Sequence, residues 1–103
     1  MAIPNELMQT FQANYLHLIA SLLRLGQIDL RTAKATAHEL LNLLPFNSYD
    51  DLQQKIKKYT EKYPKLAQLY TNILKSIDHY RTKELMSKME LLINNNQHGR
   101  PTS

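Results

Sequence analysis

The residues best suited to metal or acid–base chemistry are four histidines and one adjacent pair of carboxylates. His38-Glu39 begins like the helical zinc-protease motif, but position 42 is asparagine, where that motif needs its second histidine one turn later. The other histidines have no carboxylate or second histidine at the spacing that would place two ligands on one helical face, and they are His17, His79 and His98. The sequence therefore predicts surface histidines and no metal site.

The carboxylate pair, Asp50-Asp51, falls in the first turn of a predicted helix. Capping and the helix dipole explain acidic residues there without catalysis. The chain has no cysteine and only two glycines, so it lacks a thiol nucleophile, a thiolate metal site and a glycine-rich loop that could cradle phosphate. We therefore expect a protein that is not an enzyme and that uses no cofactor or small-molecule substrate.

Basic residues are concentrated in the second half of the chain. Up to Asp51 there are three basic and five acidic residues, and after it ten basic and four acidic, within an overall charge of +4. A helical projection places Lys55, Lys58 and Lys62 along one flank, with Lys65 just beyond. This basic patch would suit a phosphate backbone or an acidic protein face, and the third alternative is an ordinary solvated surface. Contact with an anionic membrane surface is a further alternative.

Helices are the elements that must position these residues. The chain has no valine and no tryptophan, few glycines, and much leucine, lysine and glutamine, so residues that favour strands are scarce. Apolar spacing and stop signals predict four helices, about 5–25, 30–44, 49–62 and from 64 to 93 or beyond. Their boundaries are set by Gly26, Asp29, Pro45, Ser48 and Pro64.

The apolar spacing also predicts which faces are buried. The second helix is expected to bury Leu30, Ala33, Ala37, Leu40, Leu41 and Leu44, packing against the first helix. On the third helix, Leu52, Ile56, Tyr59 and Tyr63 share a narrow sector, so the tyrosines are expected to be core residues and not platforms for stacking bases. The sequence therefore predicts an all-α fold in which three shorter helices pack on a long C-terminal helix.

The fourth helix changes its apolar face partway along. From Leu66 to Tyr80 the apolar residues share one stripe, whereas those from Leu85 onward cluster about 120° away around the axis. Either the helix breaks near residues 81–83, or its last turns project beyond the bundle, or they fray. A projecting stripe would need a partner, because exposed apolar patches usually mark contact sites. The residues of this candidate contact stripe are Leu85, Met86, Met89, Leu92 and Ile93.

These observations predict one helical domain over residues 1–93 and a flexible tail over 94–103. No apolar run is long enough to span a membrane and no secretory signal is visible, so a cytoplasmic protein is expected. The predicted function is a small, non-enzymatic module for protein–protein interaction, an adaptor or regulator that forms a homodimer or binds a protein partner through the C-terminal helix. The alternative is a nucleic-acid-binding module that uses the basic third helix.

Overall fold

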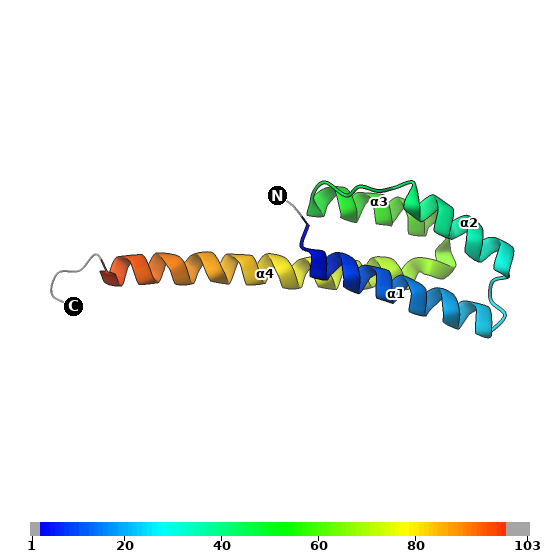
Figure 1. Ribbon diagram of the computed structural model, residues 1–103, viewed down its shortest axis with the longest axis horizontal. Helices are drawn as coiled ribbons and strands as arrows, with labels where there is room; N and C mark the ends of the chain where they lie inside the picture. The colour runs from blue at the N-terminus through cyan, green and yellow to red at the C-terminus, as the bar shows by residue number, and fades with distance from the viewer. Residues whose placement is uncertain (1–2, 99–103) are drawn as a thin grey trace.

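The chain folds into four α-helices and a short 3-10 turn. The computed structural model describes residues 3–98. Its elements are α1 (Asn5–Arg24), α2 (Leu30–Leu41), α3 (Tyr49–Lys62), the turn η1 (Pro64–Leu66) and α4 (Ala67–His98). Both α1 and α3 pack against α4, which runs in the opposite direction to them (Figure 1). The predicted all-α fold, with three shorter helices on a long C-terminal helix, is confirmed.

Local signals in the sequence set the helix boundaries. Gly26 follows α1 with a φ of 70°, a conformation that glycine adopts without strain. The carboxylate of Asp29 accepts a backbone N–H at 2.7 Å and caps α2, and the hydroxyl of Ser48 accepts one at 3.0 Å and caps α3. Pro64 occupies the first position of η1, from which the chain continues into α4. The sequence thus correctly predicts where α1, α2 and α3 begin, whereas α4 begins at Ala67, three residues after the predicted start.

A single hydrophobic core joins α1, α3 and the first half of α4. Its residues are almost completely shielded from solvent, as the spacing of apolar residues predicts. They include Leu7, Phe11 and Tyr15 of α1, Leu52, Ile56 and Tyr59 of α3, Leu66 of η1, and Leu69, Ile73 and Ile77 of α4. We call this part of the molecule, α1 to α3 with residues 67–84 of α4, the head.

Helix α2 differs from its prediction in both its length and its buried face. It ends at Leu41, three residues before the expected end, because the following residues form a turn that leads into the loop before α3. Ala33 is buried, and Ala37 and Leu40 are half-buried. The prediction was wrong for the remaining three residues, because Leu30, Leu41 and Leu44 are 60%, 62% and 47% exposed.

The middle of α2 is held by polar contacts and not by the three exposed leucines. Thr36 is only 2% exposed, and its hydroxyl lies 3.3 Å from the hydroxyl of Tyr15 on α1. The Tyr59 hydroxyl of α3 donates to the Thr36 carbonyl oxygen at 2.7 Å. Burial raises the pKa of Tyr59, so this hydroxyl keeps its proton and remains a donor. Helix α2 is therefore anchored at one buried position, and its ends carry exposed leucines.

The molecule is strongly elongated because α4 continues far beyond the head. The overall dimensions are 69 × 24 × 19 Å, and the radius of gyration is 18.8 Å, where about 13 Å is typical of a compact domain of this size. We call residues 85–98 of α4 the stalk (Figure 1). The segment 94–103, expected to be a tail, is helical as far as His98, and residues 99–103 lie outside the described part of the chain.

Candidate interaction surfaces

The five residues of the predicted contact stripe all lie on the stalk and are open to solvent. We call them the stalk stripe. Their exposed fractions are 59% for Leu85, 57% for Met86, 52% for Met89, 63% for Leu92 and 53% for Ile93. Soluble monomeric proteins rarely leave so many neighbouring large apolar side chains uncovered, and such patches commonly mark contact sites. The two methionines are flexible and polarisable, which suits an adaptable contact surface.

The stalk stripe lies on the side of α4 that is turned away from the head. Tyr80 is the last apolar residue that packs against the core, and the next one along the chain, Leu85, follows five residues later. Five residues rotate a helix by about 140° from the starting position, so the apolar face leaves the direction of α1 and α3. Leu91 lies on the opposite side of the stalk from the stripe and is 65% exposed. In the preceding turns of α4, that side of the helix faces the head.

Three polar contacts fix α4 where it leaves the head. They are the Tyr49 hydroxyl with Glu84 at 2.7 Å, Arg81 with Asp50 at 2.8 Å, and the Tyr80 hydroxyl with Glu6 at 3.2 Å. Burial, together with the bond to Glu84, raises the pKa of Tyr49 to about 12. Helix α4 continues through residues 81–83 without interruption. The predicted alternative of a break at these residues is therefore wrong, and the last turns of the helix project beyond the head.

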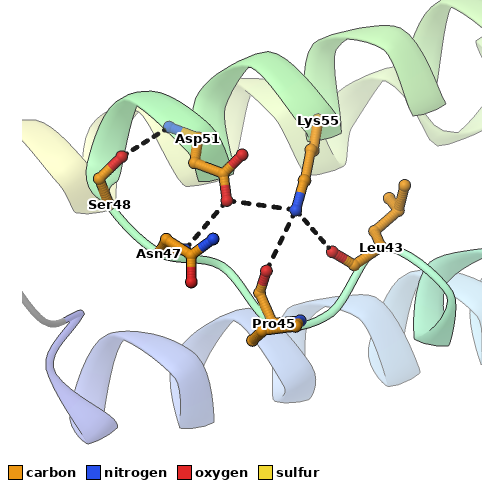
Figure 2. A network of polar contacts seen from close by, with 6 residues as sticks. All are labelled: Leu43, Pro45, Asn47, Ser48, Asp51 and Lys55. Carbon is orange, nitrogen blue, oxygen red and sulfur yellow. Dashed lines mark hydrogen bonds and ion pairs between the residues drawn. The ribbon is translucent and has the colours of Figure 1, made fainter.

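The first lysine of the predicted basic patch has a structural partner on the loop between α2 and α3. The Lys55 ammonium group donates to the carbonyl oxygens of Leu43 and Pro45 at 3.0 and 3.1 Å (Figure 2). It also pairs with Asp51 at 3.2 Å. A bond from the Asn47 N–H and the pairing with Lys55 hold the pKa of the Asp51 carboxyl below its usual value. Lys55 thus fastens the loop to α3.

Two of the other three lysines in the patch also bind groups of the head. Lys62 pairs with Glu39 of α2 at 2.8 Å, which raises the pKa of Lys62 and lowers that of Glu39. Lys65 donates to the backbone carbonyl oxygen of Gln27 in the loop between α1 and α2. Lys58 is exposed and has no hydrogen bond or ion pair within the described residues. The basic patch is therefore not a set of four unpaired lysines, because three of them bind groups of the head.

A second apolar surface, which the sequence analysis missed, lies between α1 and α2. It is a groove of about 300 Å³. Phe11, Tyr15 and Phe46 line it together with the exposed leucines Leu16, Leu41 and Leu44. The expected burial of Leu41 and Leu44 on α2 concealed this surface. The signal available in the sequence was Pro45, which ends the helix early and leaves Leu44 outside it.

The candidates for catalysis and metal binding are separated or already bonded. Among the described residues, no group of three histidine, cysteine or acidic side chains is placed to hold a metal ion. Asp50 pairs with Arg81, and Asp51 binds Asn47 and Lys55. Over the same part of the chain, no helix has the length and apolar character needed to cross a bilayer.

Comparisons of the chain with protein-family models, with curated proteins and with solved structures found no match. A proposal about function must therefore start from the surfaces described above.

Proposed function

We propose that this protein is a non-enzymatic interaction module that associates with a second copy of itself through the stalk stripe. The observation that supports this proposal is the exposure of all five stripe residues, each more than half open to solvent, on a helix that extends beyond its own core. Burying apolar surface is favourable by about 25 cal/mol per Å². A second copy offers the same apolar surface, so pairing would remove the stalk stripes of both copies from water at once.

The position of the stripe leaves room for a second helix. The head occupies the opposite side of α4, so a partner helix can lie along the stalk stripe without meeting α1 or α3. An isolated helix of about fourteen residues is only marginally stable in water, and pairing would stabilise the stalk. The head would serve as the unit that the paired stalks bring together, as expected of an adaptor or regulatory protein.

Two adjacent leucines provide a matched test. Leu92 belongs to the stalk stripe and Leu91 does not, although their exposed fractions are nearly equal, 63% and 65%. Light scattering of the purified chain should give the mass of a dimer, Leu92→Lys should shift it to monomer, and Leu91→Lys should leave it dimeric. Circular dichroism of both variants checks that the helices are retained. A wild-type monomer at all concentrations, or equal effects of the two substitutions, would contradict the proposal.

Nucleic-acid binding through the basic third helix has less support. Lys55, Lys62 and Lys65 each have an acceptor within the head, so binding phosphate would require breaking those contacts. A titration with DNA or RNA at low salt measures this alternative directly, because phosphate contacts weaken steeply as salt rises.

A further inference from the structure

We propose that the two stalks pair in parallel, with Lys88 of each chain facing Glu90 of the other. This inference rests on the proposed function, because it assumes that the stalk stripe is where two copies meet. It adds the direction of the second helix, and with it the placement of both heads at the same end of the dimer, on its two outer sides.

The apolar residues of the stripe are compatible with either direction. In projection along the helix axis, Leu85 and Leu92 lie about 40° and 60° to one side of Met89. Met86 and Ile93 lie about 60° and 40° to the other side. Both edges of the stripe are therefore apolar, and a second helix meets an apolar edge whichever way it runs. The direction depends on the residues that flank the stripe.

The two flanks of the stripe carry opposite charges. Lys88 lies about 100° from Met89 on one side, and Glu90 lies about 100° away on the other. Both side chains are exposed, and neither forms an ion pair within the described residues. Residues two positions apart point to different sides of a helix, so Lys88 and Glu90 do not pair within one chain. Each flank thus presents an unpaired charge beside the apolar contact.

Only a parallel pair brings these opposite charges together. When two helices lie parallel and face to face, the left flank of one meets the right flank of the other. Lys88 of each chain then faces the partner's Glu90, about 3 Å further along the axis, and an ion pair can form on either side of the stripe. An antiparallel pair would instead bring Lys88 to Lys88 and Glu90 to Glu90, and like charges repel.

A parallel pair can also extend beyond the stalk. In the head, the exposed residues of α4 continue the direction of the stripe, within about 40° of the direction of Met89. They are Thr71, Lys75, Asp78 and Thr82. In a parallel pair Lys75 approaches the partner's Asp78, which adds a second contact between opposite charges. In an antiparallel pair centred on Met89, the partner helix would end before reaching Lys75 and Asp78.

The positive charge of the heads is compatible with this arrangement. The head, residues 3–84, carries eleven basic and eight acidic side chains. Each head packs on the side of α4 opposite the stripe, so both α4 helices lie between the two heads of a parallel pair. Most charges of the heads are then separated by more than the Debye length, about 8 Å at physiological salt, and their repulsion is largely screened.

Cysteine cross-linking measures the direction, because the chain contains no cysteine of its own. In a parallel pair, two Leu85→Cys chains bring their sulfur atoms to the same level. In an antiparallel pair these positions are about 12 Å apart along the axis, too far for a disulfide. Under mild oxidation, Leu85→Cys should give about tenfold more disulfide-linked dimer than Leu91→Cys, which points away from a partner in either direction. Met89→Cys should cross-link in both directions and is the positive control.

Charge reversal measures the contact between Lys88 and Glu90. Lys88→Glu and Glu90→Lys should each weaken the dimer about tenfold, because each replaces two attractive pairs with two repulsive ones. The double variant should regain the wild-type affinity, because the same pairs form with their charges exchanged. Lys58→Glu and Glu61→Lys on α3 change the net charge by the same amounts at exposed positions and should leave the affinity unchanged. Sedimentation equilibrium gives the dissociation constant of each variant.

The outcomes separate this inference from the proposed function. If light scattering shows a dimer and Met89→Cys cross-links, but Leu85→Cys forms no more disulfide than Leu91→Cys, the parallel direction is overturned and the proposed function stands. Charge reversals that leave the affinity of such a dimer unchanged would overturn the inference in the same way. A dimer in which Met89→Cys fails to cross-link would place the contact elsewhere and overturn both proposals, as would a monomeric wild-type chain.

Discussion

The head half of α4 (residues 67–84) and its stalk half (residues 85–98) form one continuous helix. The apolar stripe of the head half is buried, and that of the stalk half is exposed to solvent. In the head half, Leu69 and Ile73 are 1% and 2% exposed, whereas in the stalk half Met89 and Leu92 are 52% and 63% exposed. Both halves carry apolar residues at helical spacing. Their difference shows that a helical apolar stripe identifies a contact surface but does not say whether the contact lies within the chain or outside it.

The cause of the difference is a single change of spacing. Apolar residues of the head half follow one another at intervals of three or four, which keeps them on one face. The interval of five between Tyr80 and Leu85 rotates the next apolar face away from α1 and α3. At the same point Glu84 and Arg81 form polar contacts with the start of α3, which closes the head.

The comparison is tested most strongly by truncating one leucine in each half. Leu69→Ala should lower the free energy of unfolding by about 2–5 kcal/mol, because it leaves a cavity in the core. Leu92→Ala should change it by less than about 0.5 kcal/mol at concentrations where the chain is monomeric. Urea titrations of both variants measure this, and a comparable loss for Leu92→Ala would mean that the stalk packs within its own chain.

A smaller effect is expected at the loop before α3. Lys55→Ala should cost about 1–2 kcal/mol of folding free energy, because the carbonyl oxygens of Leu43 and Pro45 lose a charged donor. The control is Lys58→Ala, which should be neutral. If the two variants lose the same stability in urea, Lys55 is a surface lysine like Lys58 and does not fasten the loop.

The attachment of α2 can be measured through one hydroxyl group. Tyr59→Phe removes the hydrogen bond to the Thr36 carbonyl oxygen and should cost about 1 kcal/mol. Tyr70→Phe is a suitable control, because Tyr70 packs against the core and its hydroxyl has no hydrogen bond to any described residue. Equal stability of the two variants in urea would show that the hydroxyl of Tyr59 does not hold α2.

A further effect concerns the junction of head and stalk and is confined to alkaline solution. Folding raises the pKa of Tyr49 from 10.0 to about 12, so its contribution to stability is complete below pH 10 and is lost as the pH rises through 12. The free energy of unfolding should therefore fall over this range, and less steeply in Tyr49→Phe. Identical pH profiles for the two proteins would show that Tyr49 ionises as freely in the folded chain as in the unfolded one.

Much of this architecture is predictable from the sequence because it depends on local interactions. Gly26, Asp29, Ser48 and Pro64 mark helix ends through the conformations and caps that those residue types favour. The stalk stripe was also found from spacing alone, since the change of face is a property of the helix.

The errors concern contacts between segments distant in sequence. The leucines at the ends of α2 were expected to be buried, but the middle of the helix is held by Thr36, whose partners Tyr15 and Tyr59 lie 21 and 23 positions away. The basic patch likewise looked like a free cationic surface in the sequence. The groups on α2 and the loops that accept hydrogen bonds from its lysines are unknown until the helices are placed. A helical projection carries no information about such partners.

The central claim is that the two halves of α4 differ because one is covered by its own chain and the other by a second copy. Hydrogen exchange along α4, measured on dilute and on concentrated protein, tests this directly. Amides of residues 69–80 should be protected equally at both concentrations, and those of residues 86–94 should become protected only as the concentration rises. Exchange rates in residues 86–94 that do not depend on concentration would contradict the account.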